Sequence, residues 1–150
     1  DSAAALCAAA AGLDFGATRV GILQESVAAR DAATYRVEVL DGEVLYGLRI
    51  TRQGEGYNLC PADACESAAK PRFEAWKVPG DIAAQVIHLA RRGQLDVGGF
   101  EFIEDRTTGE PVFFDINPLS NFVTGAKDLL GFCPTARFVE FLRRRLYAAR

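Results

Sequence analysis

Two hairpin signals constrain the fold of this chain more than any other feature of its sequence. In the first, Asp41-Gly42 separates two runs of alternating apolar and polar residues, 34–40 and 43–50. An Asp-Gly pair in this setting is typical of a two-residue hairpin turn, which also fixes the register of the two strands. The turn predicts three pairs: Leu40 with Glu43, Glu38 with Leu45, and Arg36 with Gly47.

Alternation along this hairpin gives it two different faces. One face is the candidate core and carries Tyr35, Val37, Val39, Val44, Tyr46 and Leu48. The other face is polar and carries Arg36, Glu38 and Arg49. Arg36 and Arg49 would be diagonal neighbours there, and like charges so placed repel unless an anion joins them. Glu38 would partly join them, and an external phosphate or carboxylate would do so better. A solvated sheet face accounts for the same pattern.

The second hairpin signal lies in residues 98–117, "GGFEFIEDRTTGEPVFFDIN". We take 107–109, Thr-Thr-Gly, as a three-residue loop, because glycine is preferred at the last, left-handed position. The predicted pairs are Arg106 with Glu110, Glu104 with Val112, Phe102 with Phe114, and Glu101 with Asp115. Glu101, Asp115 and Asn117 then share one face, whereas the other, core face carries Phe100, Phe102, Phe114 and Ile116.

Directly opposed carboxylates are unfavourable unless one is protonated or both share a cation. Three oxygen ligands on one rigid face suit Mg²⁺, which keeps several waters and usually also binds substrate phosphates. The sequence therefore indicates a metal site at Glu101, Asp115 and Asn117. A solvent-facing acidic hairpin is the alternative, because acidic surface strands are common.

The remaining segments predict three helices and one further strand. The helices are residues 2–11, with Ser2 as N-cap and Gly12 as stop, residues 80–93, and residues 131–150, whose buried stripe would be Phe138, Phe141, Leu142 and Leu146. Residues 20–27 read as a short strand, and residues 51–80 as an irregular connection. Strand pairs with separate helices favour an α+β fold.

Composition excludes several classes of protein. The 150 residues suffice for one domain with a core, and a net charge of −3 argues against non-specific binding to nucleic acid or membranes. We find no apolar run of membrane-helix length and no signal peptide. The four cysteines then indicate reduced thiols and a cytoplasmic location; Cys60 and Cys65 are a pair, but too few further ligands accompany them for a closed zinc site.

The acidic hairpin also resembles a known family. "FEF", a turn and then "FFDINPLSNF" are similar to the C-terminal lobe of the ATP-grasp superfamily, nearest to its RimK-like and glutathione-synthetase-like members. The resemblance implies that Glu101, Asp115 and Asn117 bind Mg²⁺ that bridges ATP phosphates, with Asp115 in place of the commoner glutamate. It implies a mostly antiparallel sheet with helices packed on one face.

Two further segments resemble this family. "ILQESV" is similar to its hinge strand, which implies that Gln24, Glu25, Ser26 and Val27 line adenine and that Asp31 reaches the ribose. "YRVEVLDGEVLYGLRI" is similar to the next hairpin, which implies that Arg36 and Arg49 act as catalytic arginines facing phosphate or acyl-phosphate. Asn58 resembles a substrate-side asparagine.

The resemblance also bears on domain organisation. Residues 1–150 would form one partial ATP-grasp domain, with residues 1–19 as a helix and connection from a preceding subdomain and residues 20–150 as the Mg-ATP-binding lobe. The family's N-terminal domain and its glycine-rich phosphate loop have no counterpart in these residues, and the chain contains no methionine. We therefore expect a piece of a longer protein that is inactive in isolation.

The implied activity is ATP-dependent ligation of a carboxylate to an amine or thiol through an acyl-phosphate. The expected substrates are small molecules or peptides that carry these groups, with ATP and Mg²⁺ as cofactors; nucleic acid and membranes are not expected partners, and homo-oligomerisation is left open. Two alternatives remain. One is an ATP-grasp kinase that phosphorylates a small-molecule hydroxyl, and the other is a non-catalytic nucleotide-binding module.

Overall fold

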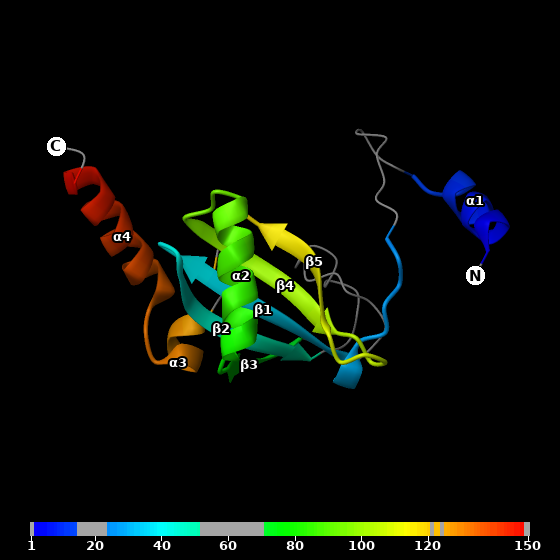
Figure 1. Cartoon of the computed structure of the whole chain (residues 1–150), viewed down its shortest axis with the longest axis horizontal. Helices are drawn as coiled ribbons and strands as arrows, with labels where there is room; N and C mark the ends of the chain where they lie inside the picture. The colour runs from blue at the N-terminus through cyan, green and yellow to red at the C-terminus, as the bar shows by residue number, and fades with distance from the viewer. Residues whose placement is uncertain (1, 15–23, 52–70, 121, 124, 149–150) are drawn as a thin grey trace.

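The fold is a five-stranded antiparallel sheet with helices packed against it, seen here in a computed structural model (Figure 1). The structure describes residues 2–14, 24–51, 71–120, 122–123 and 125–148. The strands are β1 (Ala33–Leu40), β2 (Glu43–Thr51), β3 (Arg72–Trp76), β4 (Val97–Glu104) and β5 (Pro111–Asn117), in the order β3-β2-β1-β4-β5. The helices are α1 (Ala3–Ala11), the 3₁₀ turn η1 (Arg30–Ala32), α2 (Gly80–Arg92), α3 (Ala126–Leu130) and α4 (Pro134–Ala148). The predicted α+β class is confirmed.

The Asp41-Gly42 turn forms as predicted, but the strands that it joins are not in the predicted register. Both turn residues have positive φ, 55° and 78°, and Leu40 pairs with Glu43. Leu45 then bulges out of β2, so Glu38 pairs with Tyr46 rather than Leu45, and Arg36 with Leu48 rather than Gly47. A bulge adds one unpaired residue to one strand, so every later side chain of that strand changes face.

The strand register of the second hairpin deviates from the predicted register at two places, and the two shifts cancel. Its loop is closed by Glu104 against Pro111, one residue away from the predicted pairing with Val112. Phe114 then bulges, so Phe102 faces Phe113 and not Phe114. Beyond the bulge the predicted register returns.

The loop itself has a local cause for its shape. The Asp105 side chain accepts hydrogen bonds from the backbone N–H groups of Thr107 and Thr108 at 2.6 and 3.1 Å. Gly109 takes the left-handed position with φ 76°, as its sequence predicts. These bonds lower the pKa of Asp105, because they favour the ionised carboxylate.

One face of the sheet, which we call the helix face, packs against α2 (Figure 1). Its buried residues come from β1, β4 and α2: Ala33, Tyr35, Val37, Val39, Phe100, Phe102, Ile82, Val86 and Ala90. Ile82, Val86 and Ala90 are the residues of α2 that are buried. Phe100 and Phe102 are fully buried, and burial of each ring stabilises the fold by about 1.5–3 kcal/mol.

The opposite face of the sheet has a smaller apolar cluster at the β2 end. Tyr46, Leu48 and Ile50 are buried there. Apolar residues that follow β5 along the chain pack on them: Phe122, Val123, Leu129, Leu130 and Phe132. The segment after β5, together with α3, therefore covers part of this second face.

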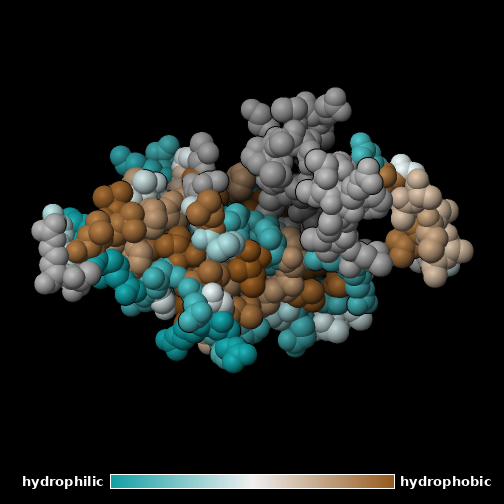
Figure 2. Space-filling model, turned by 90° about the horizontal axis from the view of Figure 1, so that it is seen from above, coloured by the Kyte–Doolittle hydropathy of each residue, from teal (hydrophilic) through white to brown (hydrophobic). Residues whose placement is uncertain are grey.

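The two terminal helices contribute little to these cores. Ser2 caps α1 by accepting a hydrogen bond from the Ala5 N–H at 3.2 Å, as predicted, but no residue of α1 is buried. In α4, Phe141 is buried as predicted, whereas Leu142 and Leu146 are 41% and 71% exposed, which contradicts the predicted stripe. The physical reason is that α4 projects from the end of the sheet (Figure 1), and apolar surface is visible at that end (Figure 2).

The predicted strand at residues 20–27 is not seen where the structure describes it. Residues 20–23 lie outside the described residues, and residues 24–28 form no strand. Ala29 makes an isolated bridge with Asp105, and the Arg106 N–H donates to the Ala28 carbonyl at 2.8 Å. The segment that leads into β1 is therefore attached at the β4–β5 loop. No helix in the described ranges has both the length and the apolar character needed to cross a membrane.

Candidate functional site

The face of the sheet opposite α2 holds a group of charged residues, which we call the acidic face. Two rows of paired residues run across the strands there. The first is Leu48, Arg36, Glu101 and Asp115, and the second is Tyr46, Glu38, Gly99 and Asn117. The predicted opposition of Glu101 and Asp115, with Asn117 on the same face, is thus confirmed.

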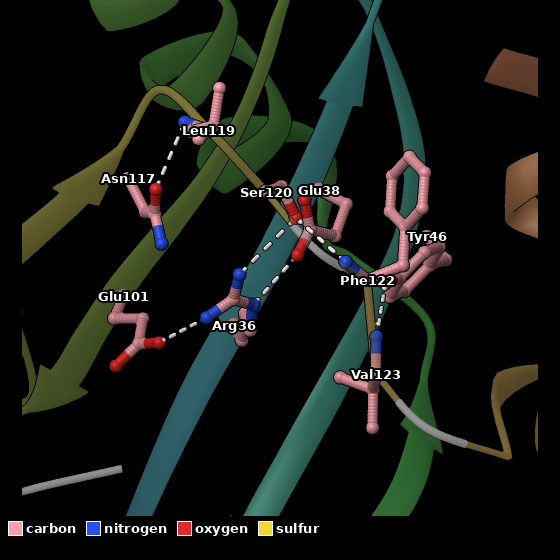
Figure 3. A network of polar contacts seen from close by, with 9 residues as sticks. All are labelled: Arg36, Glu38, Tyr46, Glu101, Asn117, Leu119, Ser120, Phe122 and Val123. Carbon is pink, nitrogen blue, oxygen red and sulfur yellow. Dashed lines mark hydrogen bonds and ion pairs between the residues drawn. The ribbon is translucent and has the colours of Figure 1, made fainter. Parts of the chain in front are cut away.

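Arg36 lies at the centre of the acidic face and uses a different nitrogen for each of three contacts (Figure 3). Its Nε donates to Glu38 Oε1 at 2.7 Å, and its Nη1 donates to Glu101 Oε1 at 2.5 Å. Its Nη2 donates to Ser120 Oγ at 3.3 Å. A planar guanidinium held by three partners is fixed in both position and orientation.

Gly99 provides the space that the Arg36 side chain occupies. A Cβ built on Gly99 would lie 2.5 Å from Arg36 Nη2 and 2.9 Å from its Cζ, well inside contact distance. The guanidinium therefore lies directly over this glycine. The requirement is for close approach, since Gly99 is not among the residues with positive φ.

Burial and charge act against each other in this site. Glu38 and Glu101 are 0% and 3% exposed. Burial raises the pKa of Glu101, and the charges of Asp115 and Glu38 raise it further. Arg36 lowers it, but the net effect is a raised pKa. Burial alone would lower the pKa of Arg36, but Glu38 and Glu101 outweigh that effect and raise it. The negative charges of Asp115 and Glu38, which add to the raised pKa of Glu101, would also favour a cation beside it.

The segment after β5 borders the acidic face through side-chain bonds to its backbone. The Leu119 N–H donates to Asn117 Oδ1 at 2.9 Å, and the Phe122 N–H donates to Ser120 Oγ at 3.2 Å. The Val123 N–H donates to the Tyr46 hydroxyl at 3.4 Å. Burial, followed by the charge of Glu38, raises the pKa of Tyr46. Ser120 thus contacts both Arg36 and the segment that covers Tyr46.

The structure does not bring Arg36 and Arg49 together, which corrects the predicted arginine pair. Arg49 pairs with Tyr35 and lies on the helix face, because the bulge at Leu45 reverses the faces of β2 beyond it. Its Nη1 lies 3.3 Å from Glu74 Oε2 on β3. Hydrogen bonding to Tyr35, and then to Glu74, raises the pKa of Arg49. Only Arg36 of the two belongs to the acidic face.

The residues predicted to bind nucleotide lie in the segment before β1. Gln24, Glu25 and Ser26 are exposed and Val27 is half-buried. Asp31 is exposed within η1, with a left-handed φ of 56°. Asn58 lies outside the described residues, as do Cys60 and Cys65.

Sequence reasoning missed Gly99 and Ser120 as parts of the site, and it did not assign Glu38 to it. Glu38 was placed on the polar face, so its position was correct, but its burial was not expected. A usable signal was present: Gly98-Gly99 lies inside a strand, where glycine often marks a close approach.

The oxygen donors of this face fit a hard divalent ion that also takes ligands from elsewhere. Glu101 binds Arg36 through one oxygen only, and its other oxygen points away (Figure 3), while Asp115 is exposed. In the described part of the chain, no group of three or more His, Cys, Asp or Glu residues could hold a metal by itself. Two carboxylates and an amide are ligands that Mg²⁺ takes, and it usually completes its shell with water and phosphate. The amide oxygen of Asn117 is turned toward the Leu119 N–H in this structure (Figure 3).

Comparison with solved structures finds similar folds within parts of other proteins. The chain is similar to the ATP-grasp ligase PsnB in complex with a minimal precursor, with a TM-score of 0.62 and 19% sequence identity, over 82% of this chain and 37% of PsnB. A PsnB complex with minimal precursor, Mg and ADP gives 0.58 and 19%, over 81% and 34%. A third, with the precursor peptide PsnA2 and AMPPNP, gives 0.54 and 17%, over 76% and 32%.

The described chain thus shares its fold with part of the ATP-grasp ligase PsnB and spans about a third of that protein's length. A scan against protein-family models gave no match, and a search of curated proteins gave none.

Proposed function

We propose that this chain is the Mg-ATP-binding lobe of an ATP-dependent ligase that joins a carboxylate to an amine or a thiol. The observation that carries the proposal is the pairing of Glu101 with Asp115 on the face that also holds Arg36 and Asn117. The fold is shared with PsnB, of which one structure contains Mg and ADP and another AMPPNP, and this supports ATP and Mg²⁺ as cofactors. Assignment to the RimK-like branch of the superfamily is part of the proposal.

In this proposal Glu101, Asp115 and Asn117 would hold the metal, which when bound would neutralise phosphate charge and orient the phosphates. Arg36 sits beside them with its guanidinium fixed by Glu38, Glu101 and Ser120. Its charge stabilises negative oxygens that develop during transfer, without reorganisation at that moment. Arg49 has no part in this role, since it lies on the other face.

The reaction proceeds in two displacements. A substrate carboxylate oxygen attacks the γ-phosphorus of ATP, giving an acyl-phosphate and ADP. The amine or thiol then attacks the acyl carbon, which releases phosphate and a proton. The chain's own contribution is positioning and charge neutralisation, as is typical of phosphoryl transfer.

Nucleotide and substrate contacts complete the proposal. Gln24, Glu25, Ser26 and Val27 would line the base and Asp31 would reach the ribose; Asn58 would face the substrate. Since PsnB structures contain precursor peptides, a peptide is favoured as one substrate.

Product analysis on the full-length protein tests the proposal. With ATP, Mg²⁺ and a carboxylate substrate, added hydroxylamine should trap the acyl-phosphate as a hydroxamate, and an amine should give ADP, phosphate and an amide. ADP with a phosphorylated alcohol and no free phosphate would instead identify a kinase. Nucleotide binding without turnover would identify a binding module.

A further inference from the structure

Glu38 is a buried carboxylate whose bonding is incomplete. Its side chain is 0% exposed, and Oε1 accepts a hydrogen bond from Arg36 Nε at 2.7 Å. Its Oε2 is buried and has no hydrogen-bond partner among the described residues. A buried carboxylate oxygen without a partner is costly and calls for an explanation beyond packing.

The charges on the acidic face do not balance. Glu38, Glu101 and Asp115 supply carboxylates, and Arg36 is the cation that forms ion pairs with Glu38 and Glu101 in the described part of the chain. Three carboxylates and one guanidinium leave two negative charges without a cation. A divalent ion beside Glu101 and Asp115 would remove that difference.

Glu38 itself is not positioned to be a metal ligand. It lies on the side of Arg36 away from Glu101, beside Ser120 (Figure 3). In the strand register it pairs with Gly99, one row away from Glu101 and Asp115. Glu38 can therefore influence a bound cation only through Arg36 and through the negative charge of its own carboxylate.

We propose that Glu38 sets the Mg²⁺ affinity of the acidic face without coordinating the metal, by sharing the charge of Arg36. With Glu38 present, one guanidinium serves two carboxylates, so Glu101 keeps negative charge for the metal. Without the charge of Glu38, Arg36 neutralises Glu101 alone and leaves Asp115 as the one carboxylate available to a cation. This inference rests on the proposed function, because it takes Mg²⁺ as the cation.

The test is Glu38→Gln in the full-length protein. Glutamine has nearly the same shape and keeps an acceptor for Arg36 Nε, but it lacks the charge. Mg²⁺ binding is measured by calorimetry at a fixed concentration of a non-hydrolysable ATP analogue. We expect the Mg²⁺ dissociation constant to increase about tenfold, as loss of one charge near a divalent ion at a partly buried site implies.

Thermal unfolding of the metal-free protein separates this role from a structural one. We expect the Glu38→Gln variant to unfold at the same temperature as the wild type or higher, because Arg36 keeps its ion pair with Glu101 while one surplus buried negative charge is removed. The matched control is Glu43→Gln, an exposed acid of the same hairpin that carries the same charge change. It should leave Mg²⁺ affinity unchanged.

Several results would overturn the inference. One is unaltered Mg²⁺ affinity in Glu38→Gln, and another is a lower unfolding temperature with unaltered affinity. If the glutamine variant does not fold, Glu38→Asp is measured instead, because aspartate keeps the negative charge. A Mg²⁺ affinity within about threefold of wild type then supports the inference, and a loss of about tenfold refutes it. Absence of Mg²⁺-dependent nucleotide binding in the wild type would refute the proposed function and this inference together, whereas the other outcomes refute only the inference.

Discussion

Arg36 and Arg49 lie on opposite faces of the same sheet, although strict alternation from the Asp41-Gly42 turn places them on one face. The bulge at Leu45 separates them. Arg36 contacts the buried carboxylates of Glu38 and Glu101, whereas Arg49 contacts Glu74, whose side chain is 39% exposed. The two arginines should therefore respond very differently to the same substitution.

Arg36→Lys is expected to lower kcat of the full-length protein by about 10²-fold, because lysine offers a point charge in place of the planar fork that binds Glu38, Glu101 and Ser120. The measurement is steady-state release of ADP at saturating Mg-ATP. Arg49→Lys is the matched control and should retain kcat within about twofold, since exposed ion pairs contribute little. Equal losses in the two variants would contradict the assignment of Arg36 alone to the site.

Glu101→Gln and Asp115→Asn should each abolish Mg²⁺-dependent turnover while leaving the protein folded. Each removes a carboxylate from an opposed pair, so the metal-free protein should be as stable as the wild type or more stable. ADP release and thermal unfolding are measured on the same samples. Glu110→Gln, an exposed acid of the same hairpin loop, is the control and should behave as wild type. Normal turnover in both site variants would show that the metal assignment is wrong.

Gly99→Ala should impair the site with little effect on the fold. The new Cβ would lie 2.5 Å from Arg36 Nη2, so the flexible end of Arg36 must move and its contacts with Glu101 and Ser120 are disturbed. We expect turnover to fall at least tenfold, with a loss of about 1–2 kcal/mol in unfolding free energy from the disturbed buried contacts. Gly80→Ala is the control, because nothing lies within 4 Å of its added Cβ. Turnover equal to that of the control would mean that the Arg36 position is not required.

The raised pKa of Glu101 predicts a defined pH dependence of stability in the metal-free protein. Burial, together with the charges of Asp115 and Glu38, raises the folded-state pKa above the ordinary 4.5, against the effect of Arg36. The contribution of this group to stability is therefore fully present below pH 4.5 and is lost as the pH rises through the folded pKa.

Urea unfolding of the wild type and Glu101→Gln over this pH range isolates the effect. The difference in unfolding free energy between the two proteins should shift against the wild type as the pH rises. Saturating Mg²⁺ with nucleotide should reverse that shift, because the metal replaces the proton. A difference that stays flat with pH, or shifts toward the wild type without metal, would show that Glu101 is not held in this way.

Local chemistry explains why much of the fold was predictable. Asp41-Gly42 and Gly109 take left-handed conformations that few other residues adopt easily, so both turns could be located from the sequence. The amphipathic pattern of α2 and the cap at Ser2 are likewise local. The opposition of Glu101 and Asp115 was also predicted correctly, but it is correct because the loop displacement and the bulge at Phe114 compensate each other.

What could not be predicted depends on contacts between distant parts of the chain. Neither bulge has a glycine or proline to mark it, since Leu45 and Phe114 are ordinary strand residues. The burial of Glu38 depends on the segment after β5 and on Gly99, which alternation along β1 does not reveal. The exposure of Leu142 and Leu146 follows from the direction in which α4 leaves the sheet, and its amphipathic pattern alone does not specify that direction.

The two bulges also affect how this chain is aligned with others. Leu45 and Phe114 each shift the count by one residue, so an ungapped alignment with a relative that lacks either bulge would match side chains from opposite faces beyond that point. A gap placed at Leu45 keeps Arg36 matched to residues of the acidic face and Arg49 to residues of the helix face. Site residues should therefore be transferred to this sequence by superposed strands, with insertions assigned at these two positions.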